Sequence, residues 1–190
     1  DAEPLIPQTA LMGMSKKHAF DGVDDHVVIA DNNAFSFGNT SAGSDVSMSI
    51  SAWILPSTTA SFPIITKGVT NTSGEWAFQL DASSKLLFQC MDNSVADGWI
   101  GRKYDTALTT GKLYHVVATY SGTEASTGIK LYINGAEVAI VTEANDEASY
   151  VAMEADSDDV WIGRYKTGST NTYANGCITE ASIWGTELSL

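Results

Sequence analysis

The chain has 190 residues, with 23 Asp and Glu against 10 Lys and Arg, giving a formal net charge of -13 and a sequence pI of about 4.3. Such a charge repels phosphate backbones and anionic lipids, so nucleic acid and membranes are excluded as expected partners. No apolar run approaches the roughly 18–20 residues that span a bilayer, and the N-terminus lacks the basic-then-apolar order of a signal peptide. The length suits one domain.

Residues 1–19 differ from the rest of the chain, because Pro4 and Pro7 interrupt an apolar stretch that has no regular period. We expect an extended arm here. Three roles stay open for it: a packed strand, a linker stub, or a docking peptide for a neighbouring subunit. The domain itself is expected to occupy residues 20–190.

Alternation of apolar and polar residues then recurs along the chain, as half-buried antiparallel strands require. At Asn134-Gly135 both residues tolerate positive φ, so a tight hairpin is expected there. Many short strands separated by small polar residues favour an all-β sandwich or barrel over βαβ units. Strands are expected at residues 48–54, 76–80, 86–90, 114–120, 129–133 and 136–140.

Residues 143–156 are ambiguous, because their Ala and Glu content favours a helix. Tyr150, Ala152 and the residues after them can equally form an edge strand that follows an acidic loop. The acidic clusters 143–147 and 156–159 are interpreted as solvated loops.

The two cysteines, Cys90 and Cys177, form no CxxC motif and lie in strand-like runs, so both are predicted to be buried free thiols, with a disulfide between them as the alternative. Four of the five tryptophans are embedded in strand patterns and are predicted to be core residues: Trp53, Trp76, Trp161 and Trp184.

A family resemblance rests on six phrases taken in order: residues 20–29 (FDGVDDHVVI), 51–54 (SAWI), 111–118 (GKLYHVVA), 130–135 (KLYING), 160–164 (VWIGR) and 178–184 (ITEASIW). In order and spacing they resemble the laminin-G-like branch of the concanavalin A-like lectin/glucanase jelly rolls. The resemblance implies an all-β sandwich jelly roll of two antiparallel sheets, and it favours the edge strand over the helix after residue 143. One such fold hosts many functions.

Three further phrases, at residues 31–39, 62–68 and 160–165, resemble laminin-G-like domains found in tail and capsid-associated proteins of marine phages. That likeness implies an extracellular or virion-surface module that decorates a virion or contacts a host surface. The arm 1–19 would then attach it to virion proteins, and an acidic surface suits an exposed outer module.

Catalysis is not expected. Glycosidases of this superfold use paired carboxylates about 5 Å apart on one strand, and no apolar strand here carries such a pair. None of the three histidines, His18, His26 and His115, lies in an HExxH motif, and no GxSxG motif is present.

Calcium is a candidate cofactor, because the turn with Asp21, Asp24 and Asp25 offers three carboxylates within five residues. The family resemblance implies that Glu180 lies nearby, although Thr179 stands where the family usually has Asp. In the alternative, the three aspartates only satisfy backbone amides of the turn.

Glycan binding is the leading expected activity, because a pyranose needs an aromatic face flanked by polar groups. Tyr165, Asn171 and Tyr173 form a second, weaker cluster. In the alternative, Trp99 is a strand residue that packs inward. The expected site lies in the loop 92–105 and comprises Asn93, Asp97, Trp99, Arg102 and Tyr104.

The sequence therefore predicts a non-enzymatic recognition or decoration module that binds a glycan or a host-surface polysaccharide. The alternatives are a purely architectural virion or cell-surface domain that binds protein neighbours, and, less favoured, a polysaccharide-active enzyme.

Overall fold

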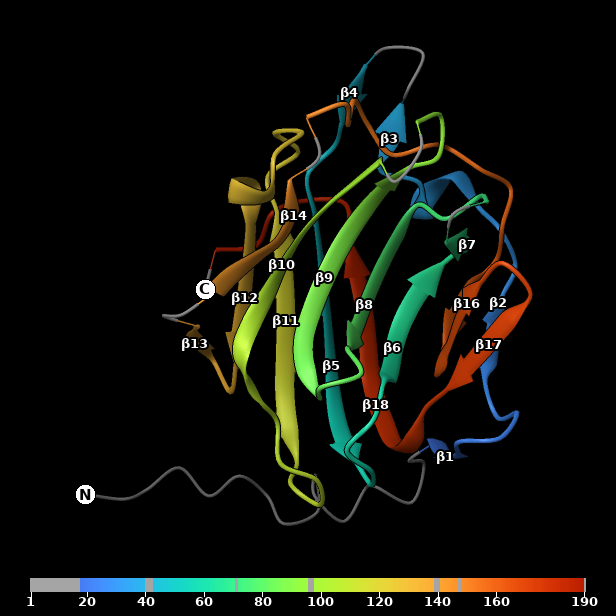
Figure 1. The fold of residues 1–190 in the computed structure, drawn as a ribbon, viewed down its shortest axis with the longest axis vertical. Coiled ribbons are helices and arrows are strands. Elements are labelled where there is room, and N and C mark those ends of the chain that lie inside the picture. Colours follow the sequence, from blue (N-terminus) through green and yellow to red (C-terminus); the bar gives the residue numbers. More distant parts are fainter. Residues whose placement is uncertain are drawn as a thin grey trace.

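The computed structural model describes residues 18–39, 43–70, 72–95, 98–138, 141–146 and 148–189. Two large sheets pack face to face in it (Figure 1), which confirms the jelly-roll sandwich. Residues 1–17 of the expected arm, together with Asp97, lie outside the described residues. His18 and Ala19, which were assigned to the arm, belong to the first strand.

One sheet has seven strands, and its neighbouring strands are antiparallel. Its strands, in spatial order, are β14 (Val141–Asp146), β10 (Gly98–Ala107), β9 (Lys85–Asp92), β8 (Trp76–Leu80), β6 (Phe62–Lys67), β15 (Val160–Ile162) and β2 (Val27–Ile29).

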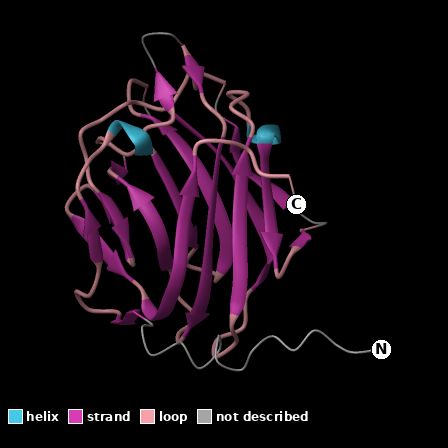
Figure 2. Ribbon diagram, turned by 180° about the vertical axis from the view of Figure 1, so that it is seen from behind, coloured by secondary structure: helices cyan, strands magenta, loops and turns pink. Residues whose placement is uncertain are grey.

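The other sheet has six strands and is seen from behind in Figure 2. The hairpin predicted at Asn134-Gly135 is confirmed: φ is 54° and 80° at these residues, and they join β12 to β13. In spatial order its strands are β1 (His18–Asp21), β18 (Asn175–Trp184), β5 (Met48–Pro56), β11 (Tyr114–Tyr120), β12 (Ile129–Ile133) and β13 (Ala136–Glu137).

Short helices and two small sheets lie outside the two large sheets. Two short 3-10 helices, η2 (Asn33–Phe35) and η3 (Ser126–Gly128), are the helical elements of the described chain. No helix in that part of the chain has the length and hydrophobicity needed to span a bilayer. The remaining strands are β7 (Val69–Thr70), β16 (Arg164–Thr167) and β17 (Thr170–Tyr173) in one small sheet, and β3 (Gly38–Asn39) with β4 (Ser44–Asp45) in another.

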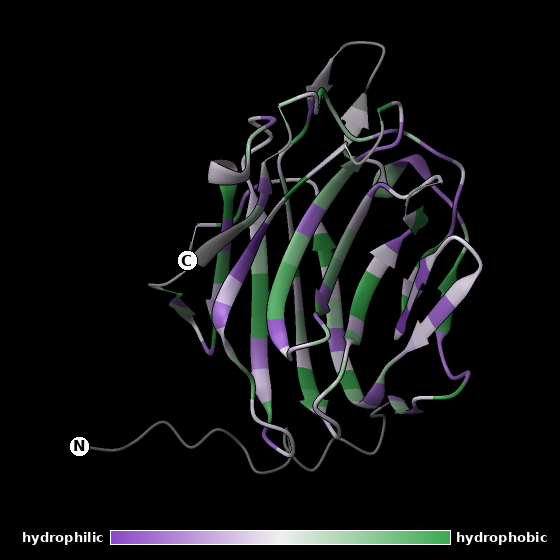
Figure 3. Cartoon of the chain, in the orientation of Figure 1, coloured by the Kyte–Doolittle hydropathy of each residue, from purple (hydrophilic) through white to green (hydrophobic). Residues whose placement is uncertain are grey.

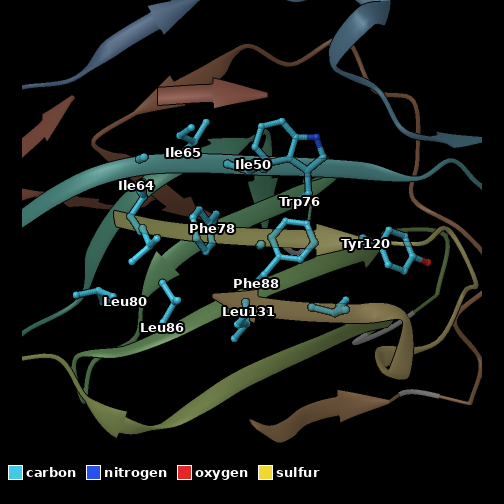
Figure 4. Packing of buried hydrophobic residues seen from close by; sticks show 14 of the residues in the cluster. Ile50, Ile64, Ile65, Trp76, Phe78, Leu80, Leu86, Phe88, Tyr120 and Leu131 are labelled. Carbon is cyan, nitrogen blue, oxygen red and sulfur yellow. The ribbon is translucent and has the colours of Figure 1, made fainter. Parts of the chain in front are cut away.

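The core lies between the two large sheets, because each strand turns alternate side chains inward. Hydrophobic and polar residues alternate along the strands of Figure 3. Phe78 and Phe88 meet edge to face, with ring centroids 6.2 Å apart. Figure 4 shows how the inward side chains pack, among them Ile50, Ile64, Ile65, Trp76, Phe78, Leu80, Leu86, Phe88, Tyr120 and Leu131.

Alternation also decides which tryptophans and cysteines are buried. Trp76 and Cys90 are buried in the core as predicted, whereas Trp161 is buried but lies on the outer face of the seven-stranded sheet, where it pairs with Thr66. The prediction was wrong for Trp53 and Trp184, which lie on the outer face of the six-stranded sheet. On β5, Ile50, Ala52 and Ile54 point inward, so the intervening Trp53 and the Ser49 that pairs with Trp184 point outward. Cys177 pairs with Leu55, another outward residue of β5, so this free cysteine also points outward and is only half-buried.

The described residues of the segment 143–156 form neither the helix nor the later edge strand. The strand comes earlier, as β14, where part of the acidic cluster 143–147 pairs with β10 instead of forming a loop. Residues 151–159 have no regular secondary structure, and hydrogen bonds to side chains of the sandwich hold them in place. The Tyr150 hydroxyl donates to Asp45 at 2.6 Å, and the Met153 amide donates to the same carboxylate at 2.8 Å.

A buried ammonium group anchors the end of this irregular segment. The Nζ of Lys67 is fully buried and lies 2.7 Å from an Asp31 carboxylate oxygen and 3.1 Å from one of Glu75. It also donates to the backbone carbonyls of Asp156, at 3.1 Å, and of Asp158, at 2.6 Å. Burial raises the pKa of Glu75 to about 7, although Lys67 opposes the shift.

Candidate functional site

The outer face of the seven-stranded sheet carries one continuous row of small and polar side chains. The row follows from the register, because directly paired residues of neighbouring strands point to the same face. Gly101, Ala77 and Thr66 of this row are small, and Trp161 at one end is its one large aromatic residue. In spatial order the row runs Gly101, Gln89, Ala77, Thr66 and Trp161.

Beside this row lies a pocket of ≈ 580 Å³ that two aromatic side chains line. Trp99 comes from β10 and Tyr165 from β16, which lie at opposite sides of β9 and β6 in Figure 1. Tyr165 reaches across the sheet, since its hydroxyl accepts a hydrogen bond from Gln89 Nε2 at 3.4 Å. Gln89 and Met91 of β9 form the floor, and Met91 is the cross-strand partner of Trp99. The pocket therefore combines aromatic surface with an amide.

Gly101 allows the Trp99 indole to lie along the sheet. A Cβ added at Gly101 would stand 2.9 Å from Trp99 Cζ3 and 3.0 Å from the Phe88 carbonyl oxygen. Trp99 itself is a strand residue, as the alternative interpretation held, but it points away from the core: its neighbour Ile100 is fully buried while Trp99 is half-buried.

The loop after β9 closes one end of the pocket and is held by its own polar groups. The Asp92 carboxylate accepts from the Ser94 amide at 3.0 Å and hydroxyl at 2.5 Å, and its second oxygen accepts from the Val151 amide at 2.9 Å. Asn93 Nδ2 donates to the Gly74 carbonyl at 2.5 Å, and the side chain also hydrogen-bonds Asp156. Asn93 thus lines the pocket but braces the loop.

The structure separates Arg102 and Tyr104 from Trp99. Arg102 pairs with the core residue Phe88, and its Nε is buried without a hydrogen-bond partner among the described residues. Tyr104 packs against the core and lines a different pocket, of ≈ 420 Å³, beside β12 and β13. Arg102 and Tyr104 lie two and four positions after Ile100, which points inward, so strand alternation turns both side chains to the inner face of β10.

Sequence reasoning missed Gln89, Met91, Thr70 and Thr167 as pocket residues. The available signal was Gln89, a polar residue in the strand 85–92 at the position that alternation turns outward. Tyr165 was placed in a cluster with Asn171 and Tyr173, whereas the structure puts Tyr165 in this pocket and the other two in a second one.

The acidic turn brings its three aspartates together. One carboxylate oxygen each of Asp21, Asp24 and Asp25 lies within 4.8 Å of the others, and all three residues are exposed. Two of these carboxylates also accept hydrogen bonds from backbone amides of the turn. Asp21 accepts from the Val23 amide at 2.8 Å, and Asp25 accepts from the Asp21 amide at 3.1 Å. Three clustered carboxylates are suitable ligands for a hard cation.

Glu180 is not part of this cluster. Asp21 pairs with Asn175 at the start of β18, and Glu180 lies five residues further along the same strand, roughly 17 Å away at the usual rise per residue. A register shift between Thr179 and Ser182 interrupts the strand there, and Glu180 has a φ of 51°.

Paired carboxylates suited to glycoside hydrolysis are not found on the outer face of β2, β6, β8, β9, β10 and β15. In these strands no two Asp or Glu residues occupy alternate outward positions. A charged pair on this face joins Lys103 to Asp81, with 3.3 Å between Nζ and the carboxylate oxygen.

The sequence profile of the Concanavalin A-like lectin/glucanases superfamily matches residues 21–190. A search of curated proteins returns no match. Solved structures share the fold at low identity. Domains LG4-5 of the mouse laminin alpha1 chain match with a TM-score of 0.61 and 15% identity over 92% of this chain and 46% of theirs.

Two further solved structures are similar. The native heptameric SAP-like pentraxin of Limulus polyphemus has a TM-score of 0.57 and 15% identity over 91% of this chain and 77% of its own. The other is a botulinum neurotoxin type C structure, whose cell entry depends on interaction with two ganglioside molecules. It has a TM-score of 0.55 and 19% identity over 100% of this chain and 42% of its own. The chain thus spans less than half of the laminin and neurotoxin chains.

Proposed function

The chain belongs to the concanavalin A-like lectin/glucanase superfamily, and from this premise we propose that it is a non-enzymatic glycan-binding module. Its sugar site is the pocket lined by Trp99 and Tyr165, and this pocket is the single observation that carries the proposal. A pyranose has one apolar face, which stacks on an aromatic ring, and a rim of hydroxyls, which amide and hydroxyl groups satisfy.

The chemistry of the pocket favours a neutral sugar. Asp92 is the one charged residue among those described as lining it, and both of its carboxylate oxygens already accept hydrogen bonds. The remaining polar groups are neutral, among them Gln89 and Thr167. The volume of ≈ 580 Å³ lies inside the range of about 300–1,000 Å³ that is typical of small-molecule sites.

A glycan-array screen of the purified chain tests this function, with Trp99→Ala as the informative variant. We expect binding to be lost with Trp99→Ala and retained with Trp184→Ala, because Trp184 is exposed on the other sheet. A blank array, or a Trp99→Ala variant that binds like the parent, contradicts the proposal. Hydrolysis of any bound glycan contradicts its non-enzymatic part.

Calcium is proposed as the cofactor of the acidic turn, held by Asp21, Asp24 and Asp25. The support is the clustering of three exposed carboxylates. An ion at 100 times its dissociation constant adds about 2.7 kcal/mol to the free energy of unfolding, so the melting temperature should rise with calcium. Asp25→Asn should abolish this rise and Glu180→Gln should not, because Glu180 lies outside the cluster. Equal melting temperatures in calcium and chelator contradict the ion.

We further propose that the module works outside the cell or on a virion surface, where its ligand is a host-surface polysaccharide and residues 1–19 contact virion proteins. The net charge of -13 supports an exposed, soluble position. A chain that lacks residues 1–17, and so keeps all of β1, should bind glycan normally and fail to assemble with its neighbours. Normal assembly of that shortened chain contradicts the attachment role.

A second candidate function is architectural, with protein neighbours and no sugar. The observation that favours it is an aromatic pair on the outer face of the six-stranded sheet, where the rings of Trp53 and His115 lie 5.0 Å apart. A blank glycan array together with retained assembly identifies this function. A Trp53→Ala variant should then assemble poorly.

A further inference from the structure

We infer that the chain has a second saccharide subsite, centred on Asn171 and Tyr173 of β17. The subsite rests on the proposed function, because it would take the same class of ligand as the pocket at Trp99. The two sites lie on different faces of the hairpin of β16 and β17: Tyr165 pairs with Thr172, whereas Asn171 pairs with Lys166, and neighbouring positions of a strand point to opposite faces.

A pocket of ≈ 560 Å³ provides the space for this ligand. It lies between β17, the loop that follows β5, and Gly22 of the turn between β1 and β2. Hydroxyl groups dominate its lining, and no Asp, Glu, Lys or Arg contributes to it among the described residues. The side chains that could contact a ligand are those of Thr58, Thr59, Ser61, Asn171 and Tyr173.

The amide of Asn171 is oriented in advance by a neighbouring cation. Arg164 donates from Nε, at 3.1 Å, and from Nη2, at 2.9 Å, to the same Oδ1 atom of Asn171. The guanidinium is itself fixed, because its Cζ lies 4.4 Å from the centroid of the buried Trp161 ring. Since Oδ1 is occupied, the two N–H groups of Nδ2 are left for acceptor oxygens in the pocket.

Tyr173 supplies the apolar surface that a sugar ring needs. It lies two residues after Asn171, so both side chains project from the same face of β17. His26 braces the tyrosine ring from the side, with 5.7 Å between the ring centroids. A braced aromatic ring, two directed donors and several hydroxyls together match a neutral pyranose.

Changes in the backbone amide chemical shifts of the nitrogen-15-labelled full chain, followed by NMR during titration with a sugar, test the subsite. The probes are the methyl glycosides of glucose, galactose and N-acetylglucosamine, each titrated separately at millimolar concentrations. We expect at least one of them to shift the amide signals of residues 58–61 and 171–173. The shifts should be equal in Trp99→Ala, which lacks the tryptophan of the first pocket. Asn171→Asp is the matched variant, because an aspartate keeps the fork from Arg164 and loses both donors. It should weaken binding here about tenfold or more and leave the shifts at residues 89–99 unchanged.

The outcomes separate the subsite from the proposed function. Shifts confined to residues 89–99 and 165–167 overturn the subsite and leave the pocket at Trp99 standing. Shifts at residues 171–173 that vanish in Trp99→Ala, or that persist in Asn171→Asp, also overturn it. Shifts at neither place with any glycoside overturn the subsite, and the glycan array then decides the proposed function independently.

Discussion

Replacing Lys67 with Met tests whether its buried ammonium holds the sandwich to the irregular segment 151–159. The side chain is fully buried and Nζ contacts four oxygens, two from carboxylates and two from backbone carbonyls. Methionine has a similar volume and shape, so the variant removes the charge and the donors while it leaves little space empty.

The magnitude follows from what each partner can do afterwards. Asp31 is 28% exposed and can turn to water, but Glu75 is fully buried, and one of its carboxylate oxygens already has no hydrogen-bond partner among the described residues. Removing one member of a buried ion pair costs about 3–5 kcal/mol, because Glu75 must then stay buried without its cation or take up a proton, and two backbone carbonyls lose their donor. At about 2–4 °C per kcal/mol for a domain of this size, the melting temperature should fall by roughly 6–20 °C.

Urea denaturation at neutral pH measures the free energy of unfolding, with Lys130→Met as the matched control. Lys130 pairs with Glu187 at 3.6 Å but both side chains are substantially exposed, so its loss should cost less than about 1 kcal/mol. The double variant Lys67→Met, Glu75→Leu should recover part of the loss, since no buried carboxylate remains. A Lys67→Met variant as stable as the Lys130→Met control refutes the reasoning, and so does a double variant no more stable than Lys67→Met alone.

Three other measurements follow from the structure. Burial raises the pKa of Glu75 from 4.5 to about 7, so the folded state binds this proton more tightly than the unfolded state does. The free energy of unfolding contributed by this group should therefore fall by about 3 kcal/mol as the pH rises from 4.5 to 7. In urea titrations at several pH values, Glu75→Gln should flatten that slope. Gly101→Ala should displace the Trp99 indole, lower the free energy of unfolding by about 1–3 kcal/mol and weaken glycan binding. A variant with the tryptophan fluorescence and glycan affinity of the parent would contradict this packing. Because burial raises the pKa of the Cys90 thiol, a thiol reagent should label Cys177 alone in the native chain, and labelling of both thiols at one rate would show that Cys90 is accessible.

The candidate site was predicted only in part. Trp99 stood out because it lies among glycines rather than in an apolar run, and the structure places it in a pocket. Arg102 and Tyr104 were grouped with it by sequence proximity, yet they point to the other face of the same strand. In a strand, proximity along the chain is a poor guide to a shared surface, because neighbouring side chains diverge.

The sequence by itself determined the architecture. Period-two alternation gives each strand one apolar face, two such sheets must bury those faces against each other, and Asn134-Gly135 suits a turn that few residue pairs can make. The tertiary structure alone decided which distant residues meet. Tyr165 contacts Gln89 across 76 positions, and Lys67 joins Asp31 to residues 156 and 158, because sheet register and loop paths depend on the packing of the whole chain rather than on any local pattern.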